Sequence, residues 1–335
     1  MPLLRSSTLL VALVALNAST CRGKNDDTKP AAAPEVSLAE VDTSALTPRE
    51  RREWAGQVSE LLAPCSDVPV SIAQCVQEKR PCKSCVPAAQ FLLKQVQAGK
   101  PKKDREEAFH GRFDTNKLRT IVTDGSPERG SPDAVVTIIE WADFECPFCK
   151  LVYPLLESLL ERFSGQVRVI YKFYPLEAHP HGEIAARAGI AALNQGKFWE
   201  MHHVMFDNQE HLEQADLERY AKQLGLDVTK FKADMTSRET TDRIAKDKKQ
   251  AEEVGLEGTP MIFINGREVD LKTLPNVYDD LEAWVKLDIE LAGKTPKPAP
   301  PKSSALPVAT GMVAPAPSAS PSGTPSSVPS ARPPK

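Results

Sequence analysis

The 335-residue sequence predicts an α/β domain preceded by a small helical domain that is held together by disulfides. Two stretches rich in β-branched residues, VVTIIEW at 135–141 and VRVIYKFYPL from Val167, are typical of buried strands. Between them, CPFCKLVYPLLESLLERF carries apolar residues at helical spacing. A strand, helix, strand unit implies a right-handed crossover between two parallel strands, and therefore a layered α/β architecture.

The segments around this unit complete the predicted domain, which spans 118–293. An all-helical stretch covers about 178–254, and the segment MIFING is predicted as a strand that ends in a hairpin turn at Asn265-Gly266. The amphipathic segment DDLEAWVKLDIELA closes the domain as a helix. Ahead of the unit, TIVTDG at 120–125 is predicted as a further strand.

Residues 46–100 are predicted to form the small helical domain, with three short helices and the cysteines Cys65, Cys75, Cys82 and Cys85. Short helices bury little apolar surface, so two stabilising disulfides are expected here. Four cysteines permit three connectivities, and the spacing does not choose among them. Cys82 and Cys85 also form a CxxC pair, which gives a second interpretation: a redox pair that relays electrons to or from Cys146 and Cys149.

The two ends of the chain differ in composition from its centre. The apolar run Leu9–Leu16 after a basic start is typical of a signal peptide, over 1–21, and it is too short to span a membrane. Cys21 follows this run in a setting that resembles the lipobox of bacterial lipoproteins, so lipidation of Cys21 is expected. Residues 22–45 and 294–335 are rich in Pro, Ala and Ser, and we expect a disordered linker and a disordered tail. The predicted location is the periplasm or cell envelope, with a lipid anchor.

Charge and composition exclude some classes of partner. Lys and Arg number 42 against 45 Asp and Glu, a net charge of −3, so no nucleic-acid partner is expected. Without Cys21 the cysteines number six, an even count that suits an oxidising compartment. The histidines at 179, 181, 202, 203 and 211 invite a metal site, but adjacent helical histidines point in different directions, and no metal is expected.

The sequence WADFECPFCK puts two cysteines directly after a buried strand and at the head of a helix. Backbone N–H groups and the helix dipole favour a thiolate at that place, and we expect Cys146 to be exposed there. Cys149, one turn further in, can close a disulfide with it or resolve a mixed disulfide. Pro147 suits the first helical turn. The alternatives are a permanent disulfide or half of a zinc site.

Residues 118–292 resemble the DsbA-like branch of the thioredoxin superfamily, in the exported form with a helical insertion between the two halves of the fold. The matching text is VTIIEWADFECPFCK, then VRVIYKFYPLEAHPHGEIAARAGIAALNQGKFWEMHHVMF, then GLEGTPMIFINGR. The resemblance implies that Cys146 is the attacking nucleophile and Cys149 the resolving thiol. It further implies that Thr259-Pro260 is the cis-proline loop, which faces the CxxC and pairs with the substrate backbone.

Glu140 stands where thioredoxins commonly carry a buried acid that exchanges a proton with the resolving thiol. The other interpretation is a carboxylate that points to solvent at the end of the strand. Between the cysteines the chain has Pro147-Phe148, whereas the strongest oxidant of the family has Pro-His. Phenylalanine offers no hydrogen bond to a thiolate, so these two residues should tune the redox couple toward a less oxidising value.

We therefore expect a thiol–disulfide oxidoreductase that acts on exported proteins through a mixed disulfide at Cys146, with the direction of electron flow open. No cofactor is expected beyond the Cys146–Cys149 disulfide. The expected partners are exported proteins with thiols or disulfides and a redox partner, for which a membrane protein is one candidate. The alternative is a non-catalytic, client-binding or scaffold lipoprotein in which the CxxC is a structural disulfide.

Overall fold

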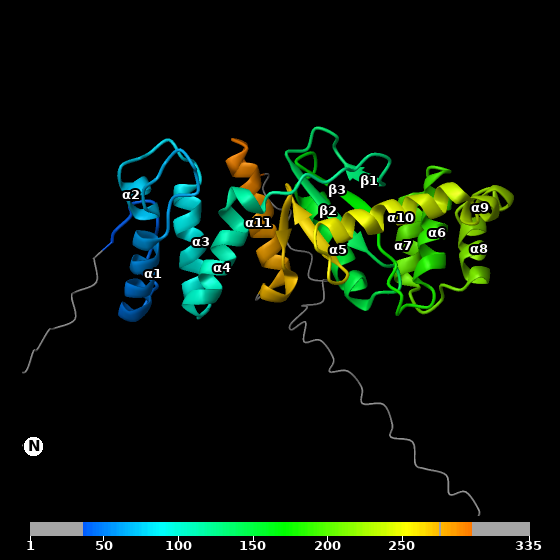
Figure 1. The fold of residues 1–335 in the computed structure, drawn as a ribbon, viewed down its shortest axis with the longest axis horizontal. Helices are drawn as coiled ribbons and strands as arrows, with labels where there is room; N and C mark the ends of the chain where they lie inside the picture. The colour runs from blue at the N-terminus through cyan, green and yellow to red at the C-terminus, as the bar shows by residue number, and fades with distance from the viewer. Residues whose placement is uncertain (1–35, 275, 297–335) are drawn as a thin grey trace, which may run out of the picture.

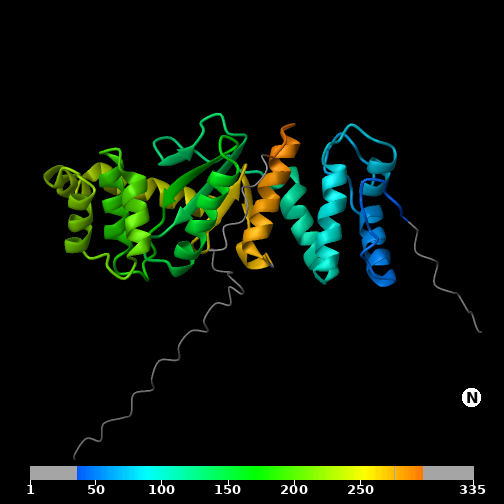
Figure 2. The same cartoon turned by 180° about the vertical axis from the view of Figure 1, so that it is seen from behind.

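The computed structural model describes residues 36–274 and 276–296. Figure 1 shows an elongated molecule with the N-terminal helices at one end, a five-stranded sheet in the middle and a group of helices at the other end. Figure 2 shows the same order from behind. The predicted signal peptide, Cys21, and nearly all of the predicted C-terminal tail lie outside the described residues. Within the part that is described, no helix combines the length and apolarity that crossing a membrane requires.

The N-terminal helical unit has one helix more than the three predicted. Its helices are α1 (Pro48–Glu60), α2 (Ile72–Gln77), α3 (Cys85–Gln97) and α4 (Lys102–Phe113). Thr47 caps α1 in a capping box with Glu50, which explains its sharp start after Leu46. Phe109 and Phe113 of α4 join the core of the unit. The helix α4 was not predicted because its apolar residues are few and its charged residues many.

The predicted linker 22–45 is wrong for its described part. Val36, Leu38 and Val41 are buried in the core of the helical unit, where they extend the apolar surface that the short helices bury. The unit therefore begins ahead of residue 46. An isolated segment of this composition has too few apolar residues to fold, but here it packs onto helices that already exist.

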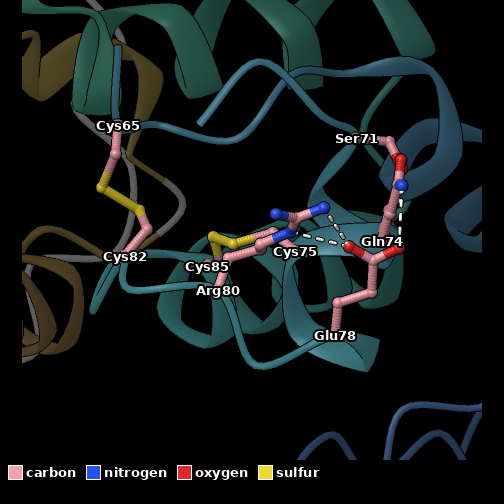
Figure 3. The surroundings of a disulfide bond; sticks show 8 residues. All are labelled: Cys65, Ser71, Gln74, Cys75, Glu78, Arg80, Cys82 and Cys85. Atoms are coloured by element: carbon pink, nitrogen blue, oxygen red, sulfur yellow. Dashed lines mark hydrogen bonds and ion pairs between the residues drawn. A yellow bond between two sulfur atoms is a disulfide. The ribbon is translucent and has the colours of Figure 1, made fainter. Parts of the chain in front are cut away.

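Two disulfides cross-link the helical unit, one between two loops and one between α2 and α3. Cys65 pairs with Cys82, and Cys75 pairs with Cys85 (Figure 3). Cys82 and Cys85 are thus not bonded to each other. The helices α4 and α11 (Val277–Leu291) lie between α1–α3 and the sheet (Figures 1 and 2), so these cysteines are separated from the CxxC pair of the other domain. This arrangement does not support a direct relay between the two pairs within one molecule.

The sheet has the strand order β1-β3-β2-β4-β5. Its strands are β1 (Glu128–Gly130), β2 (Val136–Ala142), β3 (Val167–Phe173), β4 (Met261–Ile264) and β5 (Arg267–Val269). The strands β2 and β3 are parallel, as predicted, and the other neighbours are antiparallel. The predicted strand at 120–125 is wrong, because Glu128–Gly130 pairs with the free edge of β3 in its place. Gly125 has a φ of 70° and belongs to a turn.

Helices cover both faces of the sheet. On one face, α5 (Pro147–Arg162) and α11 (Val277–Leu291) share an apolar core with β2, β3 and β4. On the other face, α10 (Arg238–Glu253) packs through Ala251 against Trp141 and Phe263. Strand alternation therefore directs even-numbered residues of β2 toward α5 and odd-numbered ones toward α10. The short 3-10 helices are η1 (Thr115–Lys117) and η2 (Leu271–Thr273).

The helical insertion lies between β3 and β4 in sequence. It consists of α6 (Gly182–Leu193), α7 (Phe198–Asp207), α8 (Gln214–Gln223), α9 (Val228–Met235) and the already described α10. Its core is continuous with the residues around the CxxC pair and includes Phe144, Tyr171 and both cysteines. The cysteine pair thus packs against the helices of the insertion.

Candidate active site

The chain turns sharply between the end of β2 and the start of α5, and this turn carries the CxxC pair. Cys146 is the N-cap residue of α5, and Pro147 occupies the first helical turn, where its missing N–H costs no hydrogen bond. The backbone N–H of Cys146 donates to Asp143 O at 3.1 Å, which closes the turn. Pro154 lies inside the same helix.

The loop before β4 lies against Cys146. The Thr259–Pro260 peptide bond is cis, the isomer that the sequence resemblance implied. The Cys146 thiol donates to Thr259 O over an Sγ–O distance of 3.3 Å. Thr259 and Pro260 are half-buried, so part of this loop faces solvent beside the sulfur. A backbone segment at this position can pair with an extended peptide.

The two cysteines have opposite pKa shifts. The pKa of Cys146 is lowered to about 6, first by the hydrogen bond that its thiolate accepts from the Cys149 thiol. The backbone N–H groups of Cys149 and Phe148 also lower it, and burial opposes them. Burial raises the pKa of Cys149 well above its ordinary value, and the neighbouring Cys146 adds to this effect. The pair therefore combines one thiolate at neutral pH with one protonated thiol.

Glu140 is buried, which excludes the solvent-facing interpretation of this residue. Only 2% of its surface is exposed, and Oε1 has no hydrogen-bond partner. Burial, and after it the charge of Cys146, raises the pKa of Glu140 to about 8. A carboxyl group with such a pKa can both take up and release a proton near neutral pH.

Cys146 is more buried than the sequence indicated. The prediction of an exposed Cys146 is wrong, since 3% of the residue is accessible and Cys149 is fully buried. The cause is tertiary, because Cys146 contacts Thr259 from a loop more than a hundred positions away. Pro147 is exposed and Phe148 is half-buried at the same surface.

Two histidines bind carboxylates of the active-site turn. Their contacts were not predicted from the sequence. His179 Nδ1 lies 2.6 Å from Asp143 Oδ2, and His181 Nδ1 lies 3.0 Å from Glu145 Oε1. The Asp143 carboxylate also accepts backbone N–H groups of Glu145 and Leu176. The order of the strands could have predicted these contacts. Residues 143–145 and 176–181 follow the carboxyl ends of the neighbouring parallel strands β2 and β3, and so meet at one edge of the sheet.

Two further residues near the pair were missed. Gln209, after α7, donates from Nε2 to the carbonyls of Phe144 and Cys146, at 2.8 Å each. Tyr171 lies opposite Glu140 in the register of β2 and β3, and its buried hydroxyl has no hydrogen-bond partner. Neither residue belongs to a local motif, because each reaches the site through the packing of distant elements.

The remaining histidines have protein contacts of their own. His202 is buried with its ring centroid 4.8 Å from that of Phe206, and His203 Nε2 lies 3.5 Å from Glu157 Oε1. In the described part of the chain, the group of three or more metal-binding side chains whose donor atoms lie together is Cys75, Cys82 and Cys85. These sulfurs are all engaged in disulfides.

Comparison with known protein families agrees with this geometry. Residues 122–286 match the family model described as thioredoxin. This part of the chain is a thioredoxin-fold domain. The helical insertion between β3 and β4 of this thioredoxin domain confirms the form predicted from the sequence.

Curated proteins similar to this chain include larger ones. The Na(+)/H(+) antiporter NhaA 3 of Salinispora tropica is 42% identical over 140 residues, which is 42% of this chain and 21% of the antiporter. The Na(+)/H(+) antiporter NhaA 1 of Mycolicibacterium gilvum is 39% identical over 153 residues, 45% of this chain and 25% of the antiporter. The match thus spans a quarter or less of these relatives, and the larger part of each lies outside it.

Similar solved structures include a thioredoxin-like oxidoreductase from Silicibacter pomeroyi, with 26% identity and a TM-score of 0.44. That similarity covers 50% of this chain and 94% of the other. Oxidised BdbD from Bacillus subtilis has 20% identity and a TM-score of 0.46, and it covers 52% of this chain and 97% of the other. In both cases the similarity extends over about half of this chain.

Proposed function

We propose that the thioredoxin domain exchanges disulfides with exported proteins through a mixed disulfide at Cys146. The observation that carries this proposal is the pairing of a Cys146 thiol of low pKa with a buried, protonated Cys149, beside the Thr259–Pro260 loop that contacts Cys146 Sγ. A thiolate is the attacking species in disulfide exchange, and a protonated neighbour does not compete with it.

The steps follow from the positions of the side chains. The Cys146 thiolate attacks a client disulfide and forms a mixed disulfide, and one client sulfur leaves as a thiolate. Cys149 then attacks Cys146 Sγ, which releases the client and closes the Cys146–Cys149 disulfide. Its proton passes to Glu140, whose pKa of about 8 suits both uptake and release. In the opposite direction, the same steps donate the disulfide to a client dithiol.

The substrate is held beside Cys146 by the Thr259–Pro260 loop. A client backbone that pairs with this loop displaces the Cys146 thiol from Thr259 O, and thereby uncovers the sulfur. We further propose that the protein lies in the periplasm or cell envelope, anchored by a lipid on Cys21, and exchanges electrons with a redox partner, for which a membrane protein is one candidate.

One observation supports the alternative function of a scaffold lipoprotein with a structural disulfide. Cys146 is only 3% exposed, and a sulfur that no partner can reach takes no part in exchange. The enzyme and the scaffold make different predictions for the reactivity of the pair.

The reduction potential of the Cys146–Cys149 couple separates them. The full chain is equilibrated in glutathione buffers, and the state of each cysteine is read by alkylation and peptide mapping, with a Cys146→Ser, Cys149→Ser variant as the blank. A potential near roughly −120 mV would mark a disulfide donor, and one near roughly −270 mV a reductase or isomerase. A couple that glutathione cannot open would overturn the proposal and favour the scaffold.

A further inference from the structure

Three of the four sulfurs in the N-terminal helical unit form one cluster. The Sγ atoms of Cys75, Cys82 and Cys85 all lie within 4.8 Å of one another. Cys82 is bonded to Cys65, and the other two are bonded to each other (Figure 3). Cys82 Sγ therefore lies next to a disulfide of which it is not a member. A thiolate generated at Cys82 would have both sulfurs of that disulfide within reach.

The four cysteines of the helical unit differ in solvent exposure, and Cys65 is the most exposed of them. Cys65 is half-buried, whereas the exposed fraction is 6% for Cys82, 1% for Cys75 and 2% for Cys85. Cys65 stands in a loop whose ends are joined by the hydrogen bond from Ala63 N to Val70 O at 2.8 Å. Leu62, at the base of this loop, is 63% exposed and offers an apolar contact to another protein. An incoming thiolate would meet Cys65 first.

The backbone favours one product of exchange within the cluster. Cys85 N–H donates to Cys82 O at 3.3 Å, so residues 82–85 form a tight turn. A hydrogen-bonded turn brings its first and last Cα atoms within about 7 Å, a distance that a disulfide can span. The exposed Lys83 lies inside this turn.

We propose that the four cysteines of the helical unit form a second redox-active site, at which a dithiol protein of the thioredoxin type reduces Cys65 and the remaining disulfide moves to Cys82–Cys85. In the first step, a donor thiolate attacks Cys65 Sγ, the Cys65–Cys82 bond breaks, and Cys82 leaves as a thiolate. Cys82 then attacks Cys85 Sγ. This forms the Cys82–Cys85 bond, breaks the Cys75–Cys85 bond and releases the Cys75 thiolate, which takes up a proton.

The second thiol of the donor completes the reaction. It attacks its partner sulfur in the mixed disulfide with Cys65, and Cys65 leaves as a thiolate that takes up a proton. The donor dithiol has then become a disulfide, while this chain has gained two thiols, at Cys65 and Cys75. Two electrons and two protons have moved, and the helical unit keeps one disulfide throughout. The site does not depend on Cys146 or Cys149, so it is testable apart from the function proposed for them.

The transfer is tested by generating the Cys82 thiol without any reductant. The full chain is prepared with Cys21→Ser, Cys146→Ser and Cys149→Ser, and Cys65→Ser is then added so that Cys82 has lost its partner. Free thiols are alkylated rapidly, and the label is mapped by mass spectrometry. We expect the label on Cys75 in most molecules, together with a Cys82–Cys85 disulfide. A label that stays on Cys82, or moves to Cys85, would overturn the proposal.

The matched control is Cys82→Ser in the same background. It leaves a free thiol at Cys65, whose sulfur lies outside the three-sulfur cluster, so the label should stay on Cys65 and the Cys75–Cys85 disulfide should persist. In the background with all four cysteines, one equivalent of dithiothreitol should expose Cys65 and Cys75 together. Exposure of Cys65 and Cys82 together would mean that no transfer occurs, and would contradict the proposal.

Discussion

The thiols of Cys146 and Cys149 belong to the same turn of helix but have different surroundings. Cys146 is the N-cap residue, where its sulfur accepts hydrogen bonds, and its pKa is lowered to about 6. In the reduced protein this shift stabilises the folded state above the ordinary thiol pKa, and the stabilisation is lost as pH falls through about 6. Cys149 lies one turn deeper and stays protonated.

Removing the donor at position 149 should raise the pKa of Cys146. In reduced Cys149→Ala the largest contribution to the low pKa is gone, so we expect the titration midpoint of Cys146 to rise from about 6 by roughly one unit or more. The ultraviolet absorbance of the thiolate, followed against pH, measures this midpoint. Cys149→Ser keeps a hydroxyl donor and should show a smaller rise. An unchanged midpoint in Cys149→Ala would contradict the assigned hydrogen bond.

Glu140 should make the reduced protein less stable as pH rises. Its pKa is about 8 when folded and 4.5 ordinarily, so between these values the unfolded chain binds fewer protons than the folded one. The contribution of Glu140 to the free energy of unfolding should therefore fall across this window. Cys146 makes the opposite contribution above about pH 6, so the net fall should lie below that pH. Glu140→Gln should remove the fall and be more stable near pH 8, by on the order of a few kcal/mol. Denaturant unfolding at several pH values measures this effect.

The same Glu140→Gln variant separates a structural from a chemical role. If Glu140 accepts the proton of Cys149, resolution of a mixed disulfide near pH 7 should slow by roughly tenfold or more. Stopped-flow release of a client thiol reports that rate. Should resolution keep its wild-type rate and pH profile in the variant, Glu140 is not the proton acceptor.

At the scale of elements, one buried ion pair joins the helical insertion to the sheet. Lys172 Nζ of β3 lies 2.9 Å from Asp247 Oδ1 of α10, and both side chains have 1% exposure or less. The second oxygen of Asp247 accepts the backbone N–H of Phe173 at 3.1 Å. The indole N–H of Trp141 donates to the Asp247 carbonyl at 3.0 Å. These contacts fix α10 across the face of the sheet opposite α5.

Asp247→Ala should strongly destabilise the thioredoxin domain. The change leaves the Lys172 ammonium buried without its partner, at an expected cost of roughly 3–5 kcal/mol in the free energy of unfolding. Adding Lys172→Met should recover part of that loss. As a control on the same helix, Asp242→Ala removes an exposed ion pair with Arg238 and should cost less than about 1 kcal/mol. Equal losses for the two single variants would refute the argument.

At the scale of the whole molecule, the helical unit and the thioredoxin domain share a buried contact. Arg112 of α4 forms an ion pair with Asp288 of α11, and the side chains are 2% and 8% exposed. The Arg112 guanidinium also lies 4.3 Å from the ring centroid of Trp284. Asn265 Nδ2 donates to the other oxygen of Asp288 at 2.9 Å. The contact ties α4 to the hairpin turn of the sheet through α11.

Arg112→Ala should uncouple the two parts of the molecule. Without Arg112, the buried Asp288 side chain loses its ion-pair partner in α4 and is left with the Asn265 hydrogen bond and the attraction of Arg267, so the interface loses a favourable contact. Scanning calorimetry should then show two separated transitions, of which the helical unit gives one. Lys102 lies on the same helix as Arg112 and forms an exposed ion pair with Glu60 of α1. Lys102→Ala, which breaks that pair, should leave the profile unchanged. A single unshifted transition in Arg112→Ala would contradict the coupling.

The sequence by itself determined the order of β2, α5, β3, the helical insertion and the β4–β5 hairpin, and the place of the CxxC pair, since these depend on local periodicity and on turn residues such as Asn265-Gly266. It did not determine α4 or β1. The patterns of β2, α5 and β3 indicated a layered α/β architecture, and the thioredoxin fold was implied by the resemblance of residues 118–292 to DsbA-like proteins. The pairing of Cys65 with Cys82, the burial of Cys146 and Glu140, and the contact of His179 with Asp143 were decided by the tertiary structure. Each depends on which distant segments meet, and a local pattern carries no information about that. The same reason explains why Val36 and Leu38 are packed although their segment alone has too little apolar surface to fold.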